Sequence, residues 1–339
     1  MQFTPIPYFI AEIGVNHDGS FDKAIRLVES ASKCGANAVK FQSFKASDVV
    51  IESAPKANYQ LETTGKDETQ KEMLQKLEIN EEWYPELRKC CDKNKLHLIS
   101  TPYTFFDAEL IKRYKFDFIK LASVSAVEFP FISQLSALEM PIIFSTGMCS
   151  LDEIDELYYY SKNLIRNFAI LHCTSSYPTK INDSNLSVLK LLIERYDCPV
   201  GFSDHTIDIR IAFAAAAMNC NIFERHFTLN KNDSGPDHRC SSDPKEFSEY
   251  IDSVRSGNLA MGSLSDKPAL AEKSNIFSMR RCMRYSHDFP KGHVIKEEDI
   301  CFKRPMEGLT GNNFLKFDGK VLKNKVLADQ PLSWDHLSS

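Results

Sequence analysis

The chain has 339 residues, 43% of them hydrophobic and 26% charged, which is enough for one large domain and a smaller one of ordinary globular composition. Its formal net charge of −5 gives no basic field that would attract nucleic acid or an anionic membrane. No stretch reaches the roughly 18 apolar residues of a membrane-spanning helix, and the N-terminus lacks the basic and apolar regions of a signal peptide.

Short apolar segments alternate along the chain with segments of helical periodicity. The first helix is expected between Ser20, a typical N-cap residue, and Gly35, which ends it. Other helices are expected at 81–95, 211–218 and 244–255, and strands at 8–13, 38–42, 96–101, 118–123, 141–147, 168–175, 199–202 and 221–223. Eight such units predict a closed (β/α)8 barrel, a TIM barrel, over residues 1–256.

Three regions depart from this alternation. Residues 45–78 form a connection longer than the usual loop of about 4 to 6 residues. Such a length is typical of a lid over a functional site or of a long solvent-exposed loop. Residues 257–280 are expected to be a linker, and residues 281–339 a small, mostly β domain with glycine-containing turns. A domain of this size has little core of its own, so we expect it to dock on another surface.

The ten cysteines are scattered and form no C-x-x-C pair. They are therefore expected to be reduced, small hydrophobic residues in a cytoplasmic protein.

The predicted strands end in polar residues. These are Glu12, Lys40, Gln42, Thr101, Lys120, Ser123, Ser145, Ser175, Tyr177, Ser203 and Glu224. A barrel interior is normally filled by branched apolar side chains, so two lysines there need anionic partners, either structural carboxylates or a ligand. With the hydroxyl groups, the lysines suit a ligand that carries both a phosphate and a carboxylate.

Two histidines, His205 and His226, follow neighbouring predicted strands. If both face the same opening they can share a divalent ion, and neutral imidazoles favour Mn²⁺, Co²⁺, Fe²⁺ or Zn²⁺ over Ca²⁺. His17 and His238 are weaker candidates for metal ligands.

A series of ordered motifs extends over all eight predicted units and into the tail. They are AEIGVNHDG at 11–19, VKFQ at 39–42, STP at 100–102, STGM at 145–148, HCTS at 172–175, YP at 177–178, SDHT at 203–206, ERHFTL at 224–229, GPDH at 235–238 and KRP at 303–305. Together they resemble the bacterial sialic acid synthases (N-acetylneuraminate synthases), a family that includes legionaminic acid synthases. The tail resembles the antifreeze-like (SAF) domain of that family.

The resemblance implies condensation of phosphoenolpyruvate with an N-acetylated hexosamine aldehyde, giving a nine-carbon nonulosonic acid and phosphate. It implies that His205 and His226 hold a divalent metal ion. Mn²⁺ is the expected ion, and Mg²⁺ and Co²⁺ are the alternatives. The implied catalytic residues are Glu12, Lys40 and Lys120. The implied phosphoenolpyruvate site is Lys40, Thr101, Lys120, Ser123, Ser145, Ser175 and Ser203, and the implied sugar site is Gln42, Asn58, Tyr177, Glu224, Asp237 and Arg304.

In the family the small domain is exchanged across a homodimer, which implies that Arg304 reaches the partner's site. Three places depart from the family pattern: Ser175 stands where asparagine is frequent, Ser125 stands where a carboxylate is common, and residues 217–220 replace a helix end that usually contains glycine. The departure at Ser125 leaves the acceptor open among N-acetylmannosamine, its 6-phosphate and a diacetamido-trideoxyhexose; no extra basic cluster in the sequence favours the 6-phosphate.

Two other functions remain open. A metal-dependent barrel aldolase or isomerase would use the histidines but leaves the lysines and hydroxyls without a ligand. A non-catalytic carbohydrate- or ice-binding protein would act through the tail and leaves the barrel opening unexplained.

Overall fold

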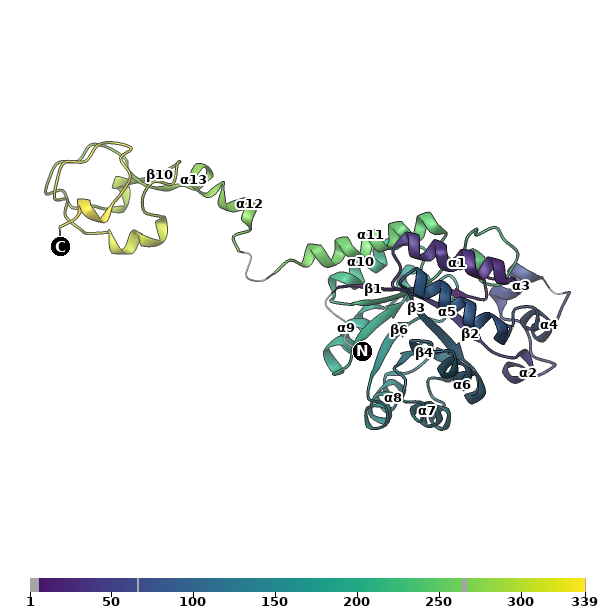
Figure 1. Cartoon of the computed structure of the whole chain (residues 1–339). Coiled ribbons are helices and arrows are strands. Elements are labelled where there is room, and N and C mark those ends of the chain that lie inside the picture. The colour runs from purple at the N-terminus through teal and green to yellow at the C-terminus, as the bar shows by residue number, and fades with distance from the viewer. Residues whose placement is uncertain (1–5, 66, 264–266, 339) are drawn as a thin grey trace. The chain divides into compact units, whose positions relative to one another are not determined.

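The computed structural model describes residues 6–65, 67–263 and 267–338, without the side chains of residues 58 and 59. The chain divides into two compact units, Met1–Met261 and Gly262–Ser339 (Figure 1). Each unit is described by itself.

The first unit is a closed barrel of eight parallel strands in sequential order, which confirms the predicted fold class. The strands are β1 Tyr8–Gly14, β2 Ala38–Ser43, β3 His97–Pro102, β4 Phe118–Leu121, β5 Ile142–Ser145, β6 Phe168–Cys173, β7 Val200–Ser203 and β8 Ile222–His226. β1 pairs with both β2 and β8 and so closes the barrel. The strands β4, β5 and β6 are shorter than expected, whereas β8 is longer and includes His226.

Helices surround the barrel (Figure 1). The α-helices of this unit are α1 Phe21–Cys34, α2 Ala46–Val49, α3 Asn58–Thr64, α4 Gln70–Gln75, α5 Tyr84–Lys93, α6 Phe105–Arg113, α7 Phe129–Ser136, α8 Leu151–Leu164, α9 Leu186–Arg195, α10 Ile209–Ala217 and α11 Pro244–Met261. Its short 3-10 helices are η1 Glu81–Trp83, η2 Ser123–Ser125, η3 Ile181–Asp183 and η4 His238–Cys240. The long connection at 45–78 therefore contains three short helices, α2 to α4.

The ends of α1 match the expected caps. The Ser20 side chain accepts a hydrogen bond from the backbone N–H of Lys23, and Gly35 closes the helix at φ 94°. Local residue chemistry therefore determines both boundaries of this helix.

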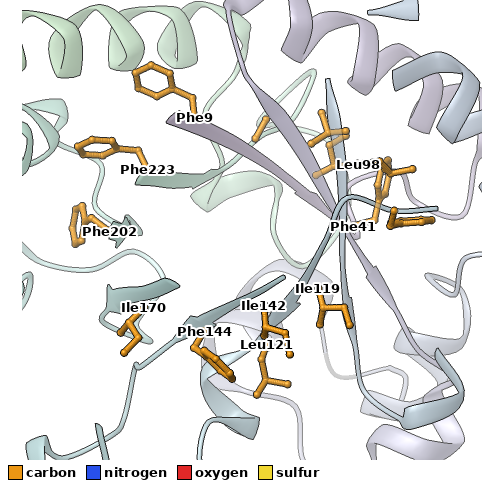
Figure 2. Packing of buried hydrophobic residues seen from close by; sticks show 14 of the residues in the cluster. Phe9, Phe41, Leu98, Ile119, Leu121, Ile142, Phe144, Ile170, Phe202 and Phe223 are labelled. Atoms are coloured by element: carbon orange, nitrogen blue, oxygen red, sulfur yellow. The ribbon is translucent and has the colours of Figure 1, made fainter. Parts of the chain in front are cut away.

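Alternation along the strands separates two buried layers. Residues of one parity point outward and pack against the helices; Figure 2 shows Phe9, Phe41, Phe144, Phe202 and Phe223 among them. Residues of the other parity fill the barrel interior, where the apolar cluster is Ile10, Ala38, Ile99, Phe118, Ile143, Ala169, Leu171 and Ile222. Two residues further along the strands, the same inward face becomes polar, as at Glu12, Lys40, Thr101, Lys120, Ser145 and Glu224. The sequence thus builds an apolar floor beneath a polar opening.

Gly257, expected at the start of the linker, lies inside α11 and is buried. A Cβ atom at this position would come within 2.5 Å of the Phe213 carbonyl oxygen and 3.1 Å of the Ala216 Cβ. The glycine therefore allows α11 to pack closely on α10 and does not end the helix, because the missing side chain is used for contact between helices.

The second unit contains the antiparallel pair β9 Cys282–Tyr285 and β10 Ile300–Lys303, preceded by α12 Leu270–Lys273 and α13 Ile276–Met279. Its 3-10 helices are η5 Glu297–Asp299, η6 Gly311–Lys316 and η7 Trp334–His336. Other segments of this unit form isolated β-bridges, such as Val294 with Val321 and Phe289 with Val326.

The expectation that this unit has little core is wrong. Its buried apolar cluster is Met283, Tyr285, Ile295, Phe317, Leu322, Val326, Leu332 and Leu337. These residues come from segments that are far apart in the sequence, so their convergence was not visible in any one of them.

All ten cysteines are free thiols, as expected. Among the described residues, no helix has both the length and the apolar character required to cross a membrane.

Candidate active site

Two lysines and two glutamates form a buried charge cluster at the C-terminal ends of the strands. Lys40 Nζ lies 2.9 Å from Glu12 Oε1 and 3.8 Å from Glu224 Oε2. Lys120 Nζ lies 3.7 Å from the other oxygen of Glu224, which also accepts a hydrogen bond of 3.0 Å from Ser203 Oγ. Glu224 therefore joins the two ammonium groups that the sequence placed on separate strands.

Two of the expected hydroxyl groups touch these lysines. Thr101 Oγ1 accepts a hydrogen bond of 3.4 Å from Lys40 Nζ. Ser145 Oγ accepts one of 2.5 Å from Lys120 Nζ. Both hydroxyls are buried, so cations and neutral hydrogen-bonding groups line one side of the opening.

The hydroxyl groups of Ser123 and Ser175 both lie close to Gly147. The Ser123 hydroxyl accepts a hydrogen bond of 2.9 Å from the Gly147 N–H. A Cβ atom on Gly147 would lie 2.3 Å from Ser175 Oγ and 2.9 Å from Ser123 Oγ. Only a glycine leaves room for both hydroxyls, a requirement that the STGM motif does not reveal by itself.

The charge cluster shifts the protonation of its members. Burial raises the pKa of Glu12 to about 7, against the opposing effect of Lys40. Burial lowers the pKa of Lys120 despite Glu224, whereas for Lys40 the two carboxylates outweigh burial and raise the pKa. One carboxylate oxygen each of Glu12 and Glu224 is buried without a hydrogen-bond partner among the described residues, which is typical of groups that face a ligand.

The two expected metal-binding histidines also meet at this opening. The ring centroids of His205 and His226 are 5.6 Å apart, and the Tyr177 ring lies 4.3 Å from the first and 5.8 Å from the second. Glu12 and His226 are direct register partners of β1 and β8. The imidazoles and the ammonium groups therefore belong to one polar layer of the barrel.

The imidazole environments fit a divalent metal ion. His205 Nδ1 lies 2.9 Å from the Thr174 carbonyl oxygen, to which it donates a hydrogen bond, and its Nε2 remains available as a ligand atom. His226 Nδ1 is buried, has no hydrogen-bond partner among the described residues, and lies 3.9 Å from Asp237 Oδ2. Burial, aided by His205, lowers the pKa of His226 well below its ordinary value, which keeps this imidazole neutral, with the lone pair of one ring nitrogen available.

The residues expected to line the sugar site fall into two groups, those at the barrel opening and those whose position relative to it is not described. The Gln42 amide donates to Glu12 Oε1 at 3.1 Å, and burial raises the pKa of Asp237 to about 6. Glu224 lies among the lysines. The Asn58 side chain is outside the described residues, and Arg304 belongs to the second unit, whose position relative to the barrel is not described.

The long connection returns to this opening through α3. The Thr63 hydroxyl donates a hydrogen bond of 3.4 Å to the carbonyl oxygen of Pro236, the residue before Asp237. Inside the connection, the buried Lys56 ammonium donates to Thr64 Oγ1 at 2.9 Å and to the Gly65 carbonyl oxygen at 3.2 Å. The connection is thus a folded segment that touches the loop carrying a predicted sugar-binding residue.

Cys173 is a further residue that the sequence did not mark. Its sulfur lies 3.8 Å from His205 Nδ1. The signal was present in the HCTS motif, because this cysteine ends β6 and has the same parity as the inward residues Ala169 and Leu171.

The weaker metal candidate His238 lies in a different cluster, with Asp18 and Asp233. Ligand atoms of these three residues lie within 4.8 Å of one another, as a metal site would require. The Lys23 ammonium, however, already pairs with both carboxylates, at 2.6 Å from Asp233 Oδ2. His238 Nε2 lies 2.9 Å from Asp18 Oδ1. A lysine therefore supplies the positive charge of this cluster.

The other weaker candidate, His17, is enclosed by aromatic rings. Its ring meets the Trp83 ring edge-on at 5.5 Å, and its Nδ1 accepts a hydrogen bond of 3.1 Å from the Gly19 N–H. Burial lowers its pKa to about 4, although Asp18 opposes this shift. These contacts describe a neutral structural histidine.

A pH-dependent loss of stability should follow from His17. Because the folded pKa is about 4 and the unfolded one about 6.5, its contribution is complete above pH 6.5 and is lost as the pH falls towards 4. Between pH 7 and pH 4.5 the wild type should lose about 2–3 kcal/mol more unfolding free energy than His17→Phe, measured by urea titration. An equal loss in both proteins would show that His17 is not buried neutral.

Comparison with known proteins places this chain in a family. The model of the NeuB family matches residues 27–266, and that of the SAF domain matches residues 280–338. A Campylobacter jejuni protein named N,N'-diacetyllegionaminic acid synthase is 37% identical over 324 residues, covering 95% of this chain and 97% of its own. A Legionella pneumophila protein of the same name is 34% identical and covers 98% and 95%.

Among solved structures, an N-acetylneuraminic acid (sialic acid) synthetase from Leptospira borgpetersenii in complex with citrate is similar with a TM-score of 0.70 at 26% identity. The likeness covers 80% of this chain and 90% of that one. The barrel, its opening and these matches agree with the resemblance seen in the motifs. The chain belongs to the NeuB family and ends in a SAF domain.

Proposed function

We propose that the protein is a nonulosonic acid synthase, which condenses phosphoenolpyruvate with an N-acylated hexosamine aldehyde and releases phosphate. The observation that carries this proposal is the single polar layer in which two buried ammonium groups lie beside two imidazoles. An aldolase or isomerase that uses no phosphoenolpyruvate would need the imidazoles alone. The lysines also pair with Glu12 and Glu224, but together with the hydroxyls they suit a ligand with both a phosphate and a carboxylate, which an aldolase or isomerase of this kind would not use.

In this proposal Lys40 and Lys120 bind the phosphate and carboxylate of phosphoenolpyruvate. The hydroxyl groups that complete this site are those of Thr101, Ser123, Ser145, Ser175 and Ser203. His205 and His226 would hold a divalent ion, proposed to be Mn²⁺, and this ion would polarise the aldehyde carbonyl. Fixing both reactants in one opening contributes to catalysis by orientation, on the order of 7 kcal/mol where the effective molarity is high.

The proposed reaction forms a carbon–carbon bond and releases phosphate from C2. C3 of phosphoenolpyruvate forms a bond to the aldehyde carbon, whose oxygen takes up a proton. Water adds to C2 and gives up one proton. The bond between C2 and the phosphate oxygen then breaks, phosphate leaves with the electron pair and takes up the proton of the C2 hydroxyl, and the 2-keto acid forms. Glu12, whose pKa is raised to about 7, is the group that takes or gives these protons, since both of its forms are populated near neutral pH.

The acceptor is proposed to be a diacetamido-trideoxyhexose, in line with the names of the two bacterial relatives. Gln42, Asn58, Tyr177, Glu224 and Asp237 would line its site. The enzyme would act as a domain-swapped homodimer in which Arg304 reaches the partner's acceptor, and the free thiols support a cytoplasmic location.

The proposal predicts phosphate release from purified protein only when phosphoenolpyruvate, Mn²⁺ and an acceptor sugar are all present. The acceptors to compare are the diacetamido-trideoxyhexose and N-acetylmannosamine, with the product identified by mass spectrometry. A nine-carbon product from N-acetylmannosamine alone would change the acceptor but keep the reaction. No phosphate release with either sugar would reject the synthase function.

A further inference from the structure

A second buried charge pair lies directly behind the two imidazoles. Arg225 Nη1 is 3.1 Å from Asp204 Oδ2, and both side chains are almost completely buried. The same guanidinium donates to Ser242 Oγ at 2.6 Å and to the Ile207 carbonyl oxygen at 3.4 Å, and it lies 4.8 Å from the centre of the Tyr250 ring. We call these residues, with Arg225 at their centre, the strand-end clamp.

Strand parity places this clamp outside the barrel interior. On β8, Glu224 and His226 face the interior, and the residue between them must face the opposite side. The contact of Arg225 with Tyr250 of α11 agrees with this, because Tyr250 packs in the layer between strands and helices. The guanidinium therefore does not meet a substrate bound in the barrel opening.

The clamp holds the backbone on both sides of the imidazoles. Asp204 Oδ1 accepts hydrogen bonds from the Thr206 N–H at 2.8 Å and from its hydroxyl at 2.7 Å, which brackets His205 in the turn after β7. The Ser242 N–H donates at 2.8 Å to the carbonyl oxygen of His226. Through Asp204 and Ser242, one guanidinium is connected to the main chain at both histidines.

A buried ion pair gives little net stability, because removing two charges from water costs about as much as their attraction returns. Its value here lies in geometry. The guanidinium presents several donors in a rigid plane, so it can set the spacing of two strand ends in a way that a lysine ammonium cannot.

We propose that the strand-end clamp positions His205 and His226 at the separation that a divalent ion requires, so that Arg225 and Asp204 determine metal affinity without touching metal or substrate. This inference rests on the proposed function, since it assumes that the two imidazoles bind the ion. It makes Arg225 and Asp204 positioning residues and not catalytic ones.

The test is the affinity of the full-length protein for Mn²⁺ alone, measured by electron paramagnetic resonance without substrates. Arg225→Lys keeps the positive charge but loses the planar set of donors, and Asp204→Asn keeps the shape but removes the charge. Each should weaken Mn²⁺ binding about 10- to 100-fold, the usual range for residues that orient metal ligands. Ser242→Ala removes one acceptor of the guanidinium while the ion pair stays, and it should give a smaller weakening in the same direction.

The matched control is the Arg88–Asp117 pair at the opposite end of the barrel. Arg88 Nη1 lies 2.6 Å from Asp117 Oδ2, and this aspartate also accepts from the N–H of Leu98, at the start of β3. Arg88→Lys should lower the melting temperature and leave Mn²⁺ affinity within about twofold, since it lies far from the strand ends that carry the imidazoles. A merely structural role of Arg225 would give the same result as this control.

The outcomes separate the two proposals. If the wild type binds Mn²⁺ and folded Arg225→Lys binds it equally well, the clamp is rejected and the proposed function stands. If Arg225→Lys and Arg88→Lys both weaken Mn²⁺ binding in proportion to the melting temperature that each variant loses, the clamp is again rejected. If the wild type itself has no affinity for Mn²⁺, the metal assignment fails and the clamp fails with it. Should Arg225→Lys and Asp204→Asn not fold, wild-type affinity in Ser242→Ala would overturn the clamp.

Discussion

Substitution of His226 by alanine should abolish phosphate release, with a loss of at least about a thousandfold in turnover, because a divalent ion held by one imidazole no longer polarises the acceptor. The fold should survive. His226 Nδ1 has no hydrogen-bond partner among the described residues, so its removal leaves no new unpaired group there. Turnover with saturating phosphoenolpyruvate, acceptor and Mn²⁺ measures the first effect, and circular dichroism the second.

His97→Ala is the control for this experiment. His97 lies at the start of β3, at the other end of the barrel, where it is exposed and pairs with the Tyr8 hydroxyl. Its loss should leave turnover unchanged. If His226→Ala kept more than a tenth of wild-type turnover, the assignment of this imidazole to the metal would have to be given up.

Replacing Lys120 by methionine should have the second largest effect. The ammonium is buried against Ser145 and Glu224, and methionine keeps the length of the side chain without its charge. Truncating one partner of a buried charge pair typically costs about 2–5 kcal/mol, so affinity for phosphoenolpyruvate should fall by roughly 30-fold to several thousandfold. Isothermal titration with phosphoenolpyruvate in the presence of Mn²⁺ measures this loss directly.

Lys56→Met provides the comparison. Lys56 is also a buried lysine that donates to a threonine hydroxyl and a backbone carbonyl oxygen, but within the 45–78 connection. Its replacement should reduce stability and leave phosphoenolpyruvate affinity near that of the wild type. A Lys120→Met protein that bound phosphoenolpyruvate within threefold of the wild type would contradict the role of this lysine.

Much of the barrel could be predicted because its signals are local. An N-cap serine and a C-cap glycine determine the ends of α1, and strand alternation places Lys40 and Lys120 on the same inward face as the apolar floor. The parallel topology then brings the ends of all strands to one opening. The lysines and His226 could therefore be assigned to one site before any coordinates were known.

Other features depend on contacts between distant segments. In the sequence, a glycine such as Gly257 looks the same whether it lies in a linker or in a helix. Only the close approach of α10 shows that Gly257 is a packing residue. The core of the second unit is likewise assembled from several short segments, none of which has a strong apolar pattern. Local sequence does not reveal such residues, because their role comes from what lies opposite them.

The sequence by itself determined the order of the elements, the period of the strands and the kinds of group that reach the barrel opening, since these follow from neighbours along the chain. Only the tertiary structure decided that Glu224 joins both lysines and that Arg225 and Asp204 meet behind the imidazoles. Pairing between charges on different strands depends on register and on side-chain reach across the barrel wall. The order of residues along the chain specifies neither the register nor the reach of the side chains. A charged residue could pair with any of several opposite charges until the closed sheet brings one of them next to it.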